Sequence, residues 1–235
     1  MPEQKPDEER GADGRSGLGA WVRETLIIVA SALVLSLVIK TFLVQAFFIP
    51  SSSMEDTLQV NDRVLVSKLA PGPLDVSRGD VVVFKDPGGW LEPADTAPRT
   101  GWRKVATDVL TYVGLLPQDS GEHLIKRVVG LPGDTVECCD PEGRLLVNGV
   151  AIDEPYLADG AVPSELDFSV TVPEGGLWVM GDNRQRSQDS RYKQGSPGGG
   201  SVPVKNVVGT AFVVVWPVDR WALLRNPGDT FEDVP

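Results

Sequence analysis

The sequence predicts a mainly β protein with antiparallel strands in a partly closed sheet, preceded by one transmembrane helix. Three observations support this class. Val-rich segments bounded by turn residues recur in the later part of the chain, no strand–helix–strand alternation appears, and a charge-free stretch lies near the N-terminus. The 25 glycines and 19 prolines among 235 residues favour many turns over a helical bundle.

Val-rich segments form the expected strands. They are residues 63–69, 80–86, 123–131, 135–139, 144–152, 167–172, 176–182 and 207–217. The pair Asn148-Gly149, between two apolar triplets, predicts a two-residue hairpin turn. The segment 102–117 differs, because its apolar residues recur near helical spacing, so we expect a helix within an insertion spanning 87–122.

The charge-free stretch runs from Thr25 to Ile39. A helix of that length reaches only about 22 Å, whereas a bilayer core needs about 30 Å. Trp21 at one interface and a snorkelling Lys40 at the other would make up the difference. Two alternatives remain open: a cleaved signal peptide with a loose cleavage motif at 44–46, and a buried helix of a soluble protein. We prefer a retained signal anchor.

The distribution of basic residues predicts the orientation of this anchor. Arg10, Arg15 and Arg23 precede the span, and Lys40 and Arg63 follow it. This modest excess places the N-terminus in the cytoplasm and the residues after the span outside.

These features predict the organisation of the whole chain. We expect a disordered cytoplasmic tail over 1–20, a transmembrane anchor over 21–46, a β-rich domain over 47–217 and a C-terminal tail over 218–235.

Composition excludes several classes of partner and site. The net charge of −11 disfavours binding to nucleic acid, whose phosphates would be repelled. One histidine and two cysteines leave too few ligands for most metal sites, so we expect no metal and no cofactor. Cys138 and Cys139 are adjacent, and because a disulfide between neighbours is strained, we interpret them as two buried free thiols.

The segment IPSSSMEDTL, residues 49–58, offers a serine nucleophile directly after the apolar span. A serine hydroxyl needs a base, and the sequence provides two candidates, His123 and Lys126. A lysine can act as a base only if burial lowers its pKa from about 10.4. In a strand, Lys126 shares a face with Val128 while Arg127 points away, so a core-facing Lys126 would be desolvated. The alternative is an edge-strand lysine that faces water.

The segment VMGDNRQRSQDSRY, residues 179–192, follows a predicted strand and concentrates Asp, Asn, Arg and Ser. By itself it predicts a polar loop held by Asp–Arg pairs.

Taken together, these segments resemble type I signal peptidases, which are membrane-anchored serine proteases with a Ser-Lys dyad. The motifs appear in the family's order: PSSSM (50–54), RGDVVVF (78–84), KRVVGLPGDT (126–135) and GDNRQRSQDSR (181–191), followed by a closing strand at 202–217. The resemblance extends from about residue 21 to 217 and implies a catalytic domain of the signal-peptidase type.

The resemblance implies a role for each matching residue. Ser53 would be the nucleophile and Lys126 the general base. The Ser51 hydroxyl and the Ser53 backbone N–H would form the oxyanion hole. Ser187 would orient the Lys126 amine. The remaining residues support the site or contact substrate: Asp182, Asp189 and Arg191 as structural support, and Phe47, Ile49, Met54 and Ile125 as apolar substrate-binding residues.

The implied activity is removal of N-terminal signal peptides from secreted preproteins, by acyl-enzyme chemistry, after small-x-small sites such as Ala-x-Ala. The implied partners are preproteins and membrane lipid, with a monomer whose catalytic domain lies on the extracytoplasmic side. Two other hypotheses are an inactive membrane-anchored binding module and a Ser-Lys self-cleaving repressor. The repressor would need an N-terminal DNA-binding domain, where this chain has a charged tail and an apolar span.

The chain departs from the family pattern at two places. Glu55-Asp56 stands where the family usually has a residue followed by proline, and Gln185-Arg186 replaces residues that are commonly Asp and Asn. The loss of proline frees the backbone φ angle of this turn and adds negative charge beside the nucleophile. Neither departure removes a proposed catalytic atom.

Overall fold

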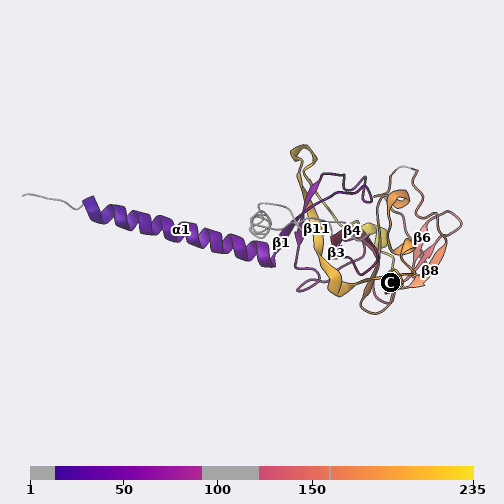
Figure 1. The fold of residues 1–235 in the computed structure, drawn as a ribbon. Helices are drawn as coiled ribbons and strands as arrows, with labels where there is room; N and C mark the ends of the chain where they lie inside the picture. The colour runs from indigo at the N-terminus through magenta and orange to yellow at the C-terminus, as the bar shows by residue number, and fades with distance from the viewer. Residues whose placement is uncertain (1–13, 92–121, 159) are drawn as a thin grey trace, which may run out of the picture. The chain divides into compact units, whose positions relative to one another are not determined.

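The computed structural model describes residues 14–91, 122–158 and 160–235 (Figure 1). The chain divides into two units, one reaching Ile39 and the other covering Lys40–Pro235. Most of the predicted N-terminal tail, residues 1–13, and the helix predicted within 102–117 lie outside the described residues.

Helix α1 (Gly14–Phe42) forms the first unit and enters the second. Its segment Gly19–Ile39 is long and apolar enough to cross a membrane, since 21 helical residues span about 32 Å. The helix differs from the predicted boundaries at both ends. Residues 14–20 are helical rather than disordered, and residues 44–46, predicted as part of the anchor, belong to a strand. An apolar strand and an apolar helix end look alike in sequence, and only pairing with a neighbouring strand separates them.

The larger sheet follows the order β1-β2-β11-β3-β4-β9-β10, with β12 beside β11. Its strands are β1 (Val44–Phe48), β2 (Arg63–Ser67), β3 (Val81–Lys85), β4 (His123–Gly130), β9 (Gly176–Met180), β10 (Val202–Pro203), β11 (Val207–Trp216) and β12 (Ala222–Leu223). Every pairing in it is antiparallel, as the sequence predicts. Within the described residues the sheet begins at β1 and ends at β10, so it is not a closed barrel.

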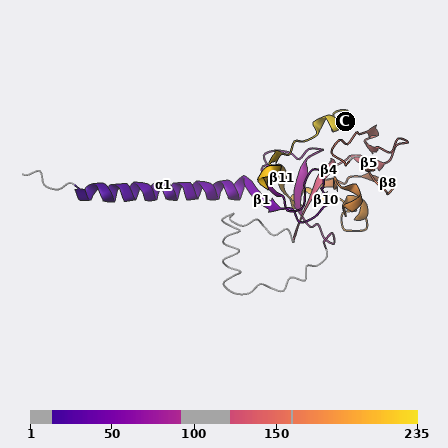
Figure 2. The same ribbon diagram turned by 90° about the horizontal axis from the view of Figure 1, so that it is seen from above.

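A smaller antiparallel sheet lies at the end of the β-rich unit away from β1 (Figures 1 and 2). Its order is β7-β6-β5-β8, formed by β7 (Val150–Ala151), β6 (Leu145–Val147), β5 (Thr135–Cys138) and β8 (Phe168–Thr171). The predicted hairpin turn is confirmed: Val147 pairs with Val150, and Asn148 and Gly149 have φ angles of 53° and 79°. Two positive φ angles in a two-residue loop define a type I′ turn.

Cys138 and Cys139 are joined by a disulfide bond, so the interpretation of two free thiols is wrong. Both residues pack against the apolar cluster beneath the smaller sheet. The bond therefore presents one apolar bridge to this cluster in place of two thiols.

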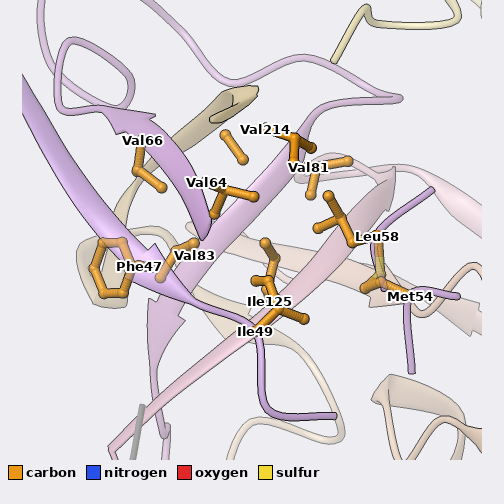
Figure 3. Packing of buried hydrophobic residues seen from close by; sticks show 11 residues of the cluster. Phe47, Ile49, Met54, Leu58, Val64, Val66, Val81, Val83, Ile125 and Val214 are labelled. Atoms are coloured by element: carbon orange, nitrogen blue, oxygen red, sulfur yellow. The ribbon is translucent and has the colours of Figure 1, made fainter. Parts of the chain in front are cut away.

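An apolar cluster under the larger sheet anchors the segment that follows β1 (Figure 3). Met54 and Leu58 from that segment are fully buried among side chains of β1, β2, β3, β4 and β11. Because these two residues bracket the turn at 55–57, burial holds the turn against the sheet.

The residues after 217 are packed rather than forming a tail. Strand β12 pairs with β11, and Phe231 and Val234 are buried in the cluster of the smaller sheet. Arg78 donates hydrogen bonds to backbone oxygens of Val234 and Pro235 as well as to Asp134. Isolated apolar residues such as Phe231 have no periodicity, so the sequence does not show that they complete a core.

This packing predicts that the C-terminal segment stabilises the β-rich unit. The substitution Phe231→Ala, at a side chain only 7% exposed, is expected to lower the free energy of unfolding by about 3 kcal/mol. Val218→Ala, at a side chain 70% exposed, is the control and is expected to change it by less than about 0.5 kcal/mol. Urea denaturation of both full-length variants in detergent measures the difference, and equal midpoints would contradict the packing role.

Candidate active site

The loop after β1 presents Ser53 between two anchored ends. At its start, the Ile49 N–H donates to the Asp62 carbonyl (2.9 Å) and the Asn61 N–H donates to the Ile49 carbonyl (2.8 Å). At its end, the Leu58 N–H donates to the Met54 carbonyl (2.7 Å). Ser53 is only 6% exposed, so the loop holds its hydroxyl in a defined, largely desolvated position.

Lys126 lies on β4 opposite Val82, and its Nζ is 2.6 Å from the Ser53 Oγ. The ammonium also donates to the Ile125 carbonyl oxygen at 3.0 Å. The side chain is 4% exposed, as the predicted Val-rich, core-facing strand requires. Burial lowers the pKa of Lys126 to about 8, although Asp189 and Asp182 raise it in part. A substantial fraction of this amine is therefore neutral near pH 8 and can accept a proton.

The alternative base, His123, makes no hydrogen bond to Ser53 in the described part of the chain. Its ring packs against Phe47 with a centroid separation of 5.3 Å, and its Nδ1 is buried without a described partner. Burial and the nearby Lys85 lower the pKa of His123. The geometry therefore brings Lys126, rather than His123, to the serine.

Ser51 and Ser187 differ in burial and in contact with Ser53. The Ser51 Oγ is 3.4 Å from the Ser53 Oγ, and its side chain is exposed. Ser187 is buried, and its Oγ makes no hydrogen bond to any described residue, so the expected bond to Lys126 is not formed in this structure.

Gly181 lies very close to both Ser53 and Ser187. The sequence analysis gave this glycine no role. A Cβ atom at this position would overlap the Ser187 side chain and the Ser53 carbonyl oxygen. Only glycine therefore lets the chain just after β9 pass this close to both Ser53 and Ser187.

Asp189 and Arg191 form a buried, two-pronged ion pair. The Arg191 Nε and Nη2 each donate to one Asp189 oxygen at 2.8 Å. Asp189 also accepts from the Gly181 N–H at 3.0 Å. The pair therefore ties the loop after β9 to the glycine that lies beside Ser53.

A second buried pair joins Arg127 to Asp182. The Arg127 Nε and Nη2 donate to the two Asp182 oxygens at 2.8 and 2.6 Å, and the Thr57 hydroxyl donates to Asp182 at 2.5 Å. The Arg127 guanidinium also lies 4.1 Å from the centre of the Tyr156 ring. Strand alternation correctly places Arg127 away from the Lys126 face, but that second face is covered by protein rather than water, and this the sequence pattern does not show.

A third buried pair joins Arg184 to Glu154. Arg184 donates to Glu154 at 2.9 Å and to the Gly181 carbonyl at 3.0 Å. The Tyr156 hydroxyl donates to the same Glu154 at 2.7 Å. The segment at 154–156 therefore connects two arginines of the site, and nothing in the sequence analysis indicated it.

The four predicted substrate-binding residues, Phe47, Ile49, Met54 and Ile125, all belong to the apolar cluster under the larger sheet (Figure 3). Each is buried. They supply an apolar underside to the loop that carries Ser53.

Asp56 has a left-handed backbone conformation, with φ at 83°. Proline is restricted to φ near −65°, so the proline typical of the family could not occupy this turn as it is folded here. Aspartate tolerates positive φ better than most residues. The replacement of the family's proline by Asp56 therefore goes with a turn conformation that proline could not adopt.

No group of three or more His, Cys, Asp or Glu side chains suited to a metal ion occurs in residues 14–91, 122–158 and 160–235.

Comparison with known families assigns this chain. The family described as "Signal peptidase, peptidase S26" matches residues 21–216. The chain belongs to this signal peptidase family. It is 40% identical over 226 residues to a probable signal peptidase I of Mycobacterium leprae, covering 84% of this chain and 77% of the relative.

Two further relatives agree. The signal peptidase I of Mycobacterium tuberculosis is 36% identical over 250 residues, covering 94% of this chain and 80% of that one. The signal peptidase I of Bacillus licheniformis is 32% identical over 221 residues, covering 91% and 96%. The protein is therefore a serine endopeptidase of the signal peptidase I type.

The Arg127–Asp182 contact predicts a large stability effect. Arg127→Leu leaves the fully buried Asp182 without its cation and is expected to lower the free energy of unfolding by about 3–5 kcal/mol. Arg186→Gln is the matched control, because Arg186 is 70% exposed and lies 3.8 Å from Glu55; it is expected to cost less than about 1 kcal/mol. Denaturant unfolding at pH 7 compares the two variants. Similar decreases in their free energies of unfolding would show that the buried pair contributes no more to stability than the exposed one.

Proposed function

We propose that this enzyme removes N-terminal signal peptides from secreted preproteins, with Ser53 as the nucleophile and Lys126 as the general base. The observation that carries the proposal is the 2.6 Å contact between the Lys126 amine and the Ser53 hydroxyl inside a largely desolvated site. An inactive binding module would have no need for a buried lysine, whose charge is costly to desolvate.

The reaction uses protein groups and water. Neutral Lys126 accepts the Ser53 proton, and the serine oxygen attacks the scissile carbonyl carbon. The Ser51 hydroxyl and the Ser53 backbone N–H donate to the resulting oxyanion. The carbon–nitrogen bond then breaks, and the proton on Lys126 passes to the leaving amine, which becomes the N-terminus of the mature protein. Lys126 next takes a proton from water, whose oxygen attacks the acyl carbonyl carbon. The ester bond to Ser53 then breaks, and Lys126 returns the proton to the Ser53 oxygen.

Ser187 would orient Lys126 during these steps. A protonated ammonium can only donate hydrogen bonds, whereas a neutral amine also accepts one. The buried Ser187 hydroxyl has no hydrogen-bond partner among the described residues, so it is available to donate to the neutral Lys126 amine once the two groups come within hydrogen-bond distance. Asp182, Asp189 and Arg191 act on the site through their ion pairs, which hold the loop after β9 in place.

The substrate would lie extended between the segment leading from β1 into Ser53 and strand β4, pairing through its backbone. The buried side chains of Phe47, Ile49, Met54 and Ile125 would form an apolar floor beneath it. Because these side chains are packed in the cluster, the floor has room only for small substrate side chains, so we expect cleavage after Ala-x-Ala-like sites.

Helix α1 would anchor a monomeric enzyme in the membrane, with residues 1–20 in the cytoplasm and the β-rich catalytic domain outside. The β-rich unit carries its own features suited to lipid. Trp216, Val218, Trp221 and Leu223 on and between β11 and β12 are all more than half exposed. Exposed tryptophans are typical of surfaces that meet the headgroup region of a bilayer.

Removal of either dyad member is expected to abolish cleavage. Full-length Ser53→Ala and Lys126→Met in detergent should each lose at least about 10³-fold in kcat/KM on a preprotein with an Ala-x-Ala site. Lys126→Met should remain folded and be at least as stable as the unsubstituted protein at pH 7, because it removes a buried charge. His123→Gln is the control and should stay active. Loss of activity in His123→Gln with retention in Lys126→Met would overturn the dyad.

The pH dependence reports which group is the base. Because burial lowers the pKa of Lys126 to about 8, kcat/KM should rise with pH, about tenfold per unit well below that pKa, and level off above it. The increase follows from the growing fraction of neutral amine. His123→Gln should leave the inflection unchanged. An inflection near pH 6.5 that disappears in His123→Gln would instead identify the histidine as the base.

A further inference from the structure

A cavity of about 490 Å³ lies beside the loop that carries the nucleophile. It is lined by Asp56 and Thr57 on one wall and by residues 155–158 on the other. Its volume is within the range of small-ligand sites, so it has room for an amino-acid side chain.

Each wall of the cavity is connected to the dyad by short contacts. On one wall, Thr57 donates to Asp182, and the next residue, Asn183, donates its N–H to the Ser53 carbonyl at 3.1 Å. On the other wall, the Tyr156 ring contacts Arg127, which directly follows Lys126 on β4. The cavity therefore lies beside the loop that carries Ser53, two hydrogen bonds from the Ser53 backbone, on the face of β4 that Arg127 rather than Lys126 occupies.

The position of the cavity along the chain indicates which part of a substrate reaches it. Strands β1 and β4 run in the same direction, because the four pairings that link them through the sheet are all antiparallel. Phe47 and Ile49 precede Ser53, and Ile125 precedes Lys126, so these residues lie toward the end from which both segments approach the dyad. Asp56 and Thr57 follow Ser53, and Arg127 follows Lys126, on the other side. An extended substrate whose residues before the scissile bond contact the apolar side has its first residues after the bond on the cavity side.

The cavity wall contains one charged group, the exposed carboxylate of Asp56. Within the residues that the structure describes, no hydrogen bond or ion pair engages this carboxylate. Its neighbour Glu55 is engaged: it accepts from the Asn183 side chain at 3.1 Å and lies 3.8 Å from Arg186. Of the two adjacent acids, only Asp56 both lines the cavity and is free to meet a ligand.

We propose that Asp56 is a specificity-determining residue that favours basic side chains, and disfavours acidic ones, among the first three residues of the mature protein. The inference rests on the proposed function. A carboxylate in the wall attracts a Lys or Arg side chain of the substrate and repels Asp or Glu. Relatives with the family's usual proline at this position should lack this charge preference, because proline carries no charge.

The test uses full-length enzyme in detergent and peptides with one Ala-x-Ala site. Lys, Ala or Glu is placed in turn at the first, second and third residue after that site. The unsubstituted enzyme is expected to show a Lys-to-Glu ratio of kcat/KM of about fivefold or more at one of these positions at low salt, shrinking in 0.5 M NaCl because salt screens exposed charges.

Substitutions assign this preference to one carboxylate. Asp56→Asn keeps a residue that tolerates the left-handed φ angle and should reduce the ratio below about twofold. Asp56→Lys should invert it. Glu55→Gln is the matched control and should retain the ratio. Because each ratio is taken within one variant, a general loss of activity or folding cancels.

The outcomes separate the two proposals. Suppose that the unsubstituted enzyme cleaves the Ala peptide, and that the Lys and Glu peptides are cleaved with a kcat/KM ratio near one at all three positions. The inference about Asp56 is then wrong, and the proposed function stands. A ratio that persists in Asp56→Asn, or that disappears in Glu55→Gln alone, also overturns the inference. If no preprotein-like peptide is cleaved at all, the proposed function itself fails.

Discussion

The desolvation of one lysine is the constraint on which the site depends. An amine in water is almost fully protonated at neutral pH and cannot act as a base. Lys126 escapes this limit because β4 lies inside the larger sheet, where its side chain is 4% exposed and its pKa falls to about 8. The folding free energy of the surrounding sheet offsets the desolvation of the amine, and the same burial brings Nζ to the Ser53 hydroxyl.

Three buried ion pairs hold the loop after β9 against this lysine. They join Arg127 to Asp182, Arg191 to Asp189 and Arg184 to Glu154. Two of them also reach the backbone of Gly181, which lies beside Ser53 without a side chain. Buried pairs of this kind add little net stability compared with apolar packing, but they are costly to break. Their contribution here is to fix where a polar loop lies.

Much of the fold was predictable because its signals are local. Val-rich runs, the Asn148-Gly149 turn and the apolar helix each depend on neighbouring residues, and the structure contains all of them. The end of the helix and the packing of Phe231 were not predictable, because both depend on contacts with residues distant in sequence. The Cys138–Cys139 bond was not predicted, because disulfides between adjacent cysteines are strained and therefore uncommon.

The sequence by itself determined the chemical types at the site: a serine motif, a lysine in an apolar strand and an Asp–Arg-rich loop, in the order of one family. Only the tertiary structure decided which of these groups meet. In the fold, Lys126 rather than His123 contacts Ser53. Arg127 is buried on a face of β4 that strand alternation alone would leave to solvent, and the Asp56 carboxylate lies at a cavity wall. The physical reason is that burial and contact are set by strands and loops far apart in the chain.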